Sequence, residues 1–132
     1  MARINAKSKG ASGEREFGKW LLDNFKLLSE NNIIPERNLL QTREGGADIT
    51  NVPCFIFEVK RCETLSLQNW WLQVNRVKSQ KIKVVAYRQN RKPWNFLISA
   101  KHIDVDKGYI ILNELVFIKY ASKLFSIYYS KK

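Results

Sequence analysis

A carboxylate and an ammonium group stand two residues apart in a short apolar stretch of the chain. Glu58 and Lys60 belong to the run Cys54–Lys60, whose aromatic and β-branched residues predict a strand. Side chains alternate across a strand, so both should share one face with Cys54 and Ile56. Charged groups are costly to bury among apolar neighbours. They therefore indicate either a functional site or a structural ion pair at the end of a strand, and spacing alone favours neither.

Asp48 adds a second carboxylate to this site. It begins the preceding predicted strand, over Asp48–Asn51, and pairing of the two strands would bring it to Glu58. Two adjacent carboxylates repel one another, and a divalent cation is the usual remedy. We expect Mg²⁺, with water and a substrate phosphate completing its coordination. Lys60 would then steady negative charge that develops on the substrate.

Hydrophobic periodicity and turn residues predict the elements that position these side chains. Strands alternating with helices predict a single α/β domain over residues 11–132, with a mixed central sheet flanked by helices, preceded by a flexible basic arm over residues 1–10. The C-terminal segment also suits a strand and could form a dimer contact or a lid. In chain order, we expect a helix from Ser12, its N-cap, to about Ser29, strands over Asn38–Arg43, Asp48–Asn51 and Cys54–Lys60, a helix from Ser66 to about Gln80, strands over Ile82–Tyr87 and Trp94–Ser99, and a helix from Glu114, capped by Asn113, to about Leu124.

The charge distribution predicts a polyanionic partner. The 132 residues carry 23 Lys and Arg against 12 Asp and Glu, a formal net charge of +11. The segment Thr64–Ile103 contains no acidic residue. A basic face can simply be solvated, but so long an acid-free segment favours nucleic acid. We expect DNA contacts from these residues: Lys7, Lys9, Ser12, Arg43, Arg61, Arg76, Lys78, Arg88, Arg91 and Lys92.

Other classes of protein are disfavoured. No apolar stretch is long enough to span a bilayer, and the polar N-terminus lacks the apolar core of a secretory signal. Two cysteines are too few for a disulfide scaffold. We therefore expect a cytoplasmic protein with no membrane partner and no small-molecule cofactor.

The chain also resembles a known nuclease superfamily. Gly46-Ala47-Asp48, nine further residues and Glu58-Val59-Lys60 resemble the PD-(D/E)XK signature, with Ala47 in place of the nominal proline. The segment Lys9–Glu16 resembles the opening of archaeal-type Holliday junction resolvases and their phage relatives. Gln73 matches a glutamine that several of these families carry on the following helix. The resemblance spans roughly residues 9 to 91.

This resemblance implies a restriction-endonuclease-like fold and a Mg²⁺-dependent DNA endonuclease in which Mn²⁺ can substitute. It implies that Asp48 and Glu58 bind the metal, with the Val59 carbonyl as a third ligand. Glu14 would bind a second metal or a water on the metal, Lys60 would position the nucleophile, and Gln73 would orient groups of the site or contact the phosphate. It also implies a homodimer acting on branched DNA, and the small size suits a phage protein in its bacterial host.

Two alternatives remain open. One is a less selective nicking or replication-associated nuclease, and the other is a non-catalytic basic DNA-binding protein. Among the remaining residues, we expect Trp70 and Trp71 to pack in the core, Glu16 to face solvent, and Cys54 to be a small packing residue. Trp94 follows basic residues and is a candidate DNA contact. We assign no catalytic role to His102.

Overall fold

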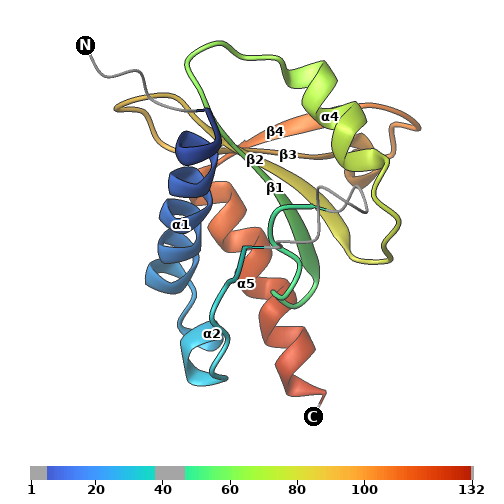
Figure 1. Cartoon of the computed structure of the whole chain (residues 1–132). Helices are drawn as coiled ribbons and strands as arrows, with labels where there is room; N and C mark the ends of the chain where they lie inside the picture. The colour runs from blue at the N-terminus through green and yellow to red at the C-terminus, as the bar shows by residue number, and fades with distance from the viewer. Residues whose placement is uncertain (1–5, 38–46, 132) are drawn as a thin grey trace.

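Four strands pair in chain order into one mixed sheet (Figure 1). The computed structural model describes residues 6–37 and 47–131, with side chains from residue 12 onward. Strand β1 runs parallel to β2, and β2, β3 and β4 pair antiparallel. The strands are β1 (Phe55–Arg61), β2 (Ile82–Arg88), β3 (Asn95–Ser99) and β4 (Tyr109–Asn113).

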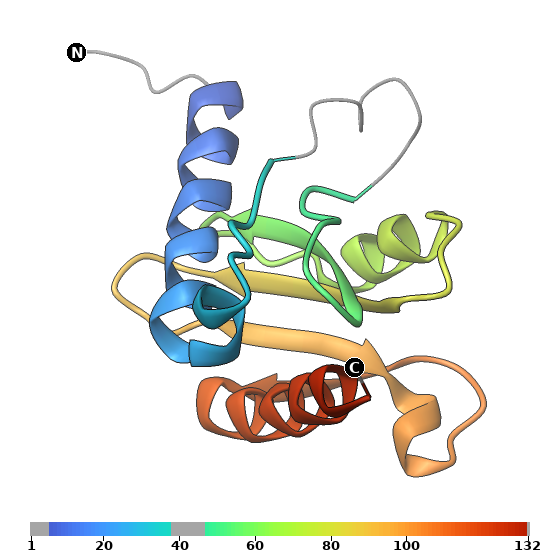
Figure 2. The ribbon, with the colours of Figure 1, turned by 90° about the horizontal axis from the view of Figure 1, so that it is seen from below.

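Helices cover both faces of this sheet, and Figure 2 shows α5 and α4 on opposite sides of it. The larger core cluster joins α1 and α5 to the inward-facing residues of the strands, including Phe55, Phe57 and Val59 of β1. The smaller cluster packs α4 against the other face. The helices are α1 (Ala6–Asn24), α2 (Lys26–Glu30), α4 (Leu67–Asn75), a 3₁₀ turn η1 (Ala100–Ile103) and α5 (Glu114–Ser130).

The central prediction of an α/β domain with a mixed sheet and flanking helices is confirmed. The alternation of side chains predicted for the strand over Cys54–Lys60 also holds within β1. Phe55, Phe57 and Val59 lie in the larger core cluster, whereas Glu58 is held by a side chain of α4 on the other face. The β2–β3 hairpin is present as expected.

The N-terminal helix differs from the prediction. It begins at Ala6, so residues 6–10 are helical and Ser12 lies inside the helix rather than at its N-cap. Alanine and lysine, which occur in the first turns, are good helix formers and extend the helix past the Ser-Gly pair. The helix also ends earlier than expected, at Asn24, because Phe25 adopts an extended conformation before α2.

Three further predictions of secondary structure were wrong. Asp48–Asn51 is not a strand, although Ile49 makes isolated antiparallel bridges to Arg37 and Phe57. Helix α4 ends at Asn75, where the Asn75 side chain donates a hydrogen bond to the Trp71 carbonyl at 2.7 Å. Strand β4 was missed because only Ile110 and Leu112 of its five residues pack toward the larger core cluster.

The C-terminal segment is a helix, which decides between the two predictions for it. Asn113 is the N-cap, as expected, because its side-chain oxygen accepts a hydrogen bond from the Val116 N–H at 2.9 Å. The helix runs to Ser130, beyond the expected end near Leu124. The predicted strand over Asn38–Arg43 and the turn over residues 44–46 lie outside the described residues. Among the described helices, none has the length and apolar character needed to cross a membrane.

Candidate active site

Backbone pairing brings Asp48 beside Glu58. The Ile49 N–H donates to the Phe57 carbonyl at 3.0 Å, and the Phe57 N–H donates to the Ile49 carbonyl at 2.9 Å. The neighbours of this bridged pair, Asp48 and Glu58, are both about 5% exposed. The Asp48 carboxylate accepts a hydrogen bond from the Val59 N–H at 2.7 Å, so its side chain is held on β1. The approach predicted from the spacing therefore occurs, through one bridge instead of a full strand.

Long-range hydrogen bonds hold the segment that carries Asp48. Lys81 donates from Nζ to the carbonyls of Thr50 and Val52 at 2.8 and 2.9 Å. The Asn51 side chain donates to the Ile34 carbonyl and accepts from the Glu36 N–H. These contacts satisfy backbone groups that a regular strand would have paired, which explains how Asp48 is positioned without one.

Glu58 has two further partners on its face of the sheet. Gln73, on α4, donates from Nε2 to Glu58 Oε1 at 3.3 Å. Lys60 Nζ lies 3.6 Å from the same oxygen, and its side chain is about a quarter exposed. The structure therefore gathers Asp48, Glu58, Lys60 and Gln73, four of the five predicted catalytic residues, at one place on β1.

The electrostatic environment opposes the ionised form of Glu58. The pKa of Glu58 is raised from 4.5 to about 8, first by burial and then by the nearby Asp48 carboxylate, whose effect exceeds the opposite effect of the Lys60 ammonium. The single ammonium group of Lys60 therefore does not neutralise the two buried carboxylates of Asp48 and Glu58. A divalent cation would supply the missing positive charge, and carboxylate oxygens are the ligands that Mg²⁺ prefers. The donor set of Asp48 and Glu58 thus fits the expected ion.

Glu14 of α1 is linked to the segment that carries Asp48 through Arg37. Its buried carboxylate forms an ion pair with Arg37, with Nε and Oε2 2.7 Å apart. Arg37 pairs through its backbone with Ile49, the residue after Asp48. Across the described residues, no group of three or more His, Cys, Asp or Glu side chains gathers closely enough to hold a metal ion. Arg37 was not among the predicted residues, because nothing local to its sequence points to Glu14.

A glycine permits α1 to approach β1 closely. A Cβ on Gly13 would lie 2.9 Å from the Arg61 Cβ and 4.0 Å from Val59 Cγ1. Such a separation from another Cβ is too short, so a larger residue would push the helix away from the strand. Gly13 therefore fixes the position of Glu14 relative to the end of β1.

Glu16 is not a simple solvent-facing residue, contrary to expectation. Its carboxylate lies between two guanidinium groups, with Arg61 Nε 3.6 Å away and Arg88 Nη1 in hydrogen-bond contact. Arg61 and Arg88 are register partners at the ends of β1 and β2. The prediction erred because the charge pairing joins a helix to two strands that are distant in sequence.

The other predicted DNA contacts are scattered. Arg76, Lys78, Arg91 and Lys92 are exposed, as is Ser12, which is within 3.5 Å of the Arg15 guanidinium. The side chains of Lys7 and Lys9, and the whole of Arg43, lie outside the described residues.

Two expectations for single residues were wrong. Trp94 is 2% exposed and packs on Phe17 with ring centroids 5.0 Å apart, so it belongs to the core and does not face DNA. Cys54 does not share the face of Glu58. It has a positive φ of 71°, lies before β1 and packs toward α5, where its thiol is 3.9 Å from the Leu124 carbonyl. Strand alternation therefore does not extend to it.

Two other expectations hold. Trp70 and Trp71 are buried in the smaller core cluster, as predicted, and Cys54 is a packing residue. His102 is exposed and interacts with the Tyr120 hydroxyl at 2.8 Å, away from the carboxylates.

Comparison with protein-family models, with curated proteins and with solved structures finds no match to this chain.

Proposed function

We propose that this protein is a Mg²⁺-dependent DNA endonuclease with a restriction-endonuclease-like fold, acting on branched DNA as a Holliday junction resolvase. One observation carries the proposal. Two buried carboxylates, Asp48 and Glu58, meet beside Lys60, and the pKa of Glu58 rises to about 8. Such an arrangement is costly to maintain unless a cation binds there. The basic surface and the PD-(D/E)XK-like spacing support DNA as the substrate.

In the proposed reaction, Asp48 and Glu58 would hold Mg²⁺, or Mn²⁺ in its place, and the Val59 carbonyl would be a third ligand. The bound ion would supply Lewis-acid stabilisation of the charge that develops on the scissile phosphate. The Val59 N–H orients the Asp48 carboxylate, and Gln73 orients that of Glu58. Glu14 is the third acidic group, held at the neighbouring edge by Arg37.

Lys60 has the freedom to act on the substrate. Its ammonium is 3.6 Å from Glu58, and its side chain is partly exposed. From there it can orient the attacking water or stabilise the phosphate oxygens as charge increases. Water attacks phosphorus in line, one P–O ester bond breaks, and the products are a phosphate monoester and a hydroxyl group.

The experiment compares a synthetic four-way junction with a matched linear duplex, in Mg²⁺ or in EDTA. We expect nicks that require Mg²⁺ and are confined to the junction. Asp48→Asn and Lys60→Ala should each lower the cleavage rate at least about 100-fold while leaving junction binding in place. Lys26→Gln is the matched control, because Lys26 is an exposed cation on α2.

The outcomes separate the candidate functions. Undiminished cleavage by both variants would exclude the proposed site. Equal rates on linear and branched DNA would favour the less selective nuclease, and salt-sensitive binding without cleavage in any divalent metal would favour the non-catalytic DNA-binding protein. Paired cuts in a junction require two sites, so the proposal includes a homodimer, which light scattering of the protein bound to a junction would detect.

A further inference from the structure

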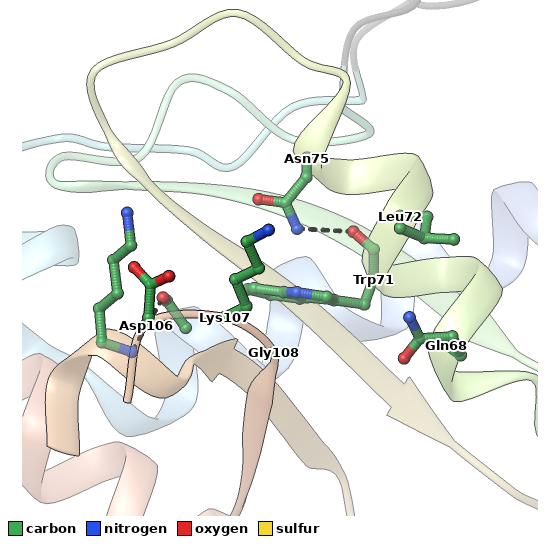
Figure 3. Close-up of a pocket in the computed structure, with 9 residues that line it drawn as sticks. Gln68, Trp71, Leu72, Asn75, Asp106, Lys107 and Gly108 are labelled. Atoms are coloured by element: carbon green, nitrogen blue, oxygen red, sulfur yellow. Dashed lines mark hydrogen bonds between the residues drawn. The ribbon is translucent and has the colours of Figure 1, made fainter. Parts of the chain in front are cut away.

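A cavity of about 380 Å³ lies on the opposite flank of α4 from the candidate active site (Figure 3). One wall comes from α4, through Gln68, Trp71, Leu72 and Asn75. The other comes from the end of β3, from η1 and from the 106–108 loop before β4. The volume is within the range of roughly 300–1,000 Å³ that small-molecule sites occupy.

The α4 wall combines an apolar surface with amide groups. Trp71 is anchored in the smaller core cluster and is only 7% exposed, so a small part of its indole lines the cavity, next to Leu72, which is 48% exposed. The side chain of Asn75 donates to the Trp71 carbonyl at 2.7 Å, which orients its amide (Figure 3). Gln68 lies at the other end of this wall. Such a wall suits a flat, largely apolar ring that carries hydrogen-bonding groups at its edge.

The opposite wall is positively charged. Lys101 and Lys107 both line the cavity and are exposed, and Asp106 is the single acidic residue among the lining residues. Figure 3 shows the Lys107 side chain above the indole of Trp71. A further ammonium, that of Lys83, donates to the Asn75 carbonyl at 3.3 Å. The two lysines outnumber the one aspartate of the lining, and Lys83 adds a positive charge next to Asn75, which favours an anionic ligand.

We propose that this cavity binds one unpaired nucleotide of a DNA strand, with its base against Trp71 and Leu72 and its phosphate on Lys101 and Lys107. The proposal deepens the proposed function and rests on it for the choice of DNA as the ligand. An aromatic or apolar surface beside basic side chains is the combination that binds single-stranded nucleic acid without sequence preference.

The position of α4 links the cavity to the candidate active site. Successive residues of an α-helix are about 100° apart, so Gln73 lies on the flank opposite Gln68 and Asn75. Gln73 contacts Glu58 on its own side, whereas the cavity lies on the other. A helix is roughly 10 Å across, so a strand cut at Glu58 would reach the cavity after crossing α4, within a few nucleotides. Arg76 is exposed at the end of this helix.

Binding measurements in EDTA test the cavity without any cleavage. The probes are a single-stranded thymidine oligonucleotide and a four-way junction. The double variant Lys101→Gln/Lys107→Gln should bind the single strand about tenfold more weakly than the wild type at 150 mM salt, with a shallower salt dependence. The matched control is Lys119→Gln/Lys123→Gln, which removes the same charge from exposed positions of α5. Equal weakening by both double variants would overturn the proposal.

Photo-crosslinking tests the base contact. Single strands carrying 5-iodouracil should crosslink to the α4 peptide that contains Trp71 and Leu72, and Lys101→Gln/Lys107→Gln should reduce this product severalfold. Crosslinks confined to other peptides would contradict the assignment. The two proposals fail separately. If the protein shows the crosslink but never cleaves DNA, the nuclease proposal fails and the nucleotide site stands. If the protein cleaves junctions but the two double variants bind DNA equally well, the nucleotide site fails and the nuclease proposal stands.

Discussion

At the scale of single residues, the buried carboxyl group of Glu58 suits the proposed metal binding but lowers the stability of the metal-free protein above pH 4.5. Its carboxyl group is buried beside Asp48, and its pKa is raised from 4.5 to about 8. At pH below about 4.5 the folded and unfolded states both hold the proton. As pH rises toward 8, the unfolded state releases its proton while the folded state retains it, so stability falls over this window.

The substitution Glu58→Gln should therefore stabilise the metal-free protein. Glutamine keeps the size of the side chain and an oxygen that can accept from Gln73, but it does not ionise. We expect a gain on the order of 2 kcal/mol at pH 8 that disappears near pH 4, measured by urea unfolding in EDTA. The control is Glu30→Gln, which alters an exposed i,i+4 ion pair and should change stability by less than about 0.5 kcal/mol at either pH.

A gain that stays constant with pH, or an outright loss, would show that the ionised form of Glu58 is not strained in the folded protein. Asp48 and Glu58 would then not require a cation for electrostatic reasons. Added Mg²⁺ should raise the stability of the wild type more than that of Glu58→Gln, because the substitution removes one of the two charged ligands.

At the scale of elements, two glycines of α1 have different surroundings, and only Gly13 faces β1. A Cβ on Gly13 would lie 2.9 Å from the Arg61 Cβ, whereas a Cβ on Gly18 would lie 3.6 Å from the nearest atom, the Pro35 Cβ. The first separation forces a backbone shift, and the second is an ordinary van der Waals contact. The two positions therefore form a matched pair.

Gly13→Ala should lower stability by about 1–3 kcal/mol, since overpacking outweighs the better helix propensity of alanine. It should also lower the cleavage rate on a junction, because Glu14 moves with the helix. Gly18→Ala should raise stability by about 0.5–1 kcal/mol and leave cleavage unchanged. Thermal unfolding and the junction assay measure both effects. Similar behaviour of the two variants would mean that the approach of α1 to β1 is not limited by Gly13.

At the scale of the whole molecule, an aromatic cluster joins α1, the sheet and α5 into one core. Phe117 of α5 stacks on Phe96 of β3 with ring centroids 4.0 Å apart and an angle of 7° between the rings. Phe17 of α1 packs on Phe57 and Phe96 in the same cluster. The C-terminal helix therefore belongs to the core and is not a lid that opens over a site.

Phe117→Ala should cost about 3–5 kcal/mol and keep a single cooperative unfolding transition, because the cluster joins α1, the sheet and α5. Leu115, two residues earlier and 62% exposed, provides the control. Leu115→Ala should change stability by no more than about 0.5 kcal/mol. Two separate transitions in the wild type, by calorimetry, would contradict the description of one domain.

Sequence patterns with a short range predicted much of the fold. Alternation in β1 separated Glu58 from Phe55 and Phe57, and the hairpin of β2 and β3 followed from its turn residues. The cap at Asn113 was recognised because its bond to the Val116 N–H spans three residues. The N-terminal helix boundary was not, because Ser12 looks like a cap but lies in a segment that already favours helix.

The amino-acid sequence by itself determined which residue types meet at the candidate site, because strand alternation and the spacing of Asp48 and Glu58 are local properties of the chain. Only the tertiary structure decided how they are held. The ion pairs of Glu14 and Glu16 join α1 to residues distant in sequence, and the hydrogen bond from the Val59 N–H to Asp48 forms beside an isolated bridge instead of the predicted strand pair. The cavity beside α4 likewise exists only where helix, strand end and loop meet. Such contacts depend on which surface covers which strand, and no periodicity along the chain encodes that choice.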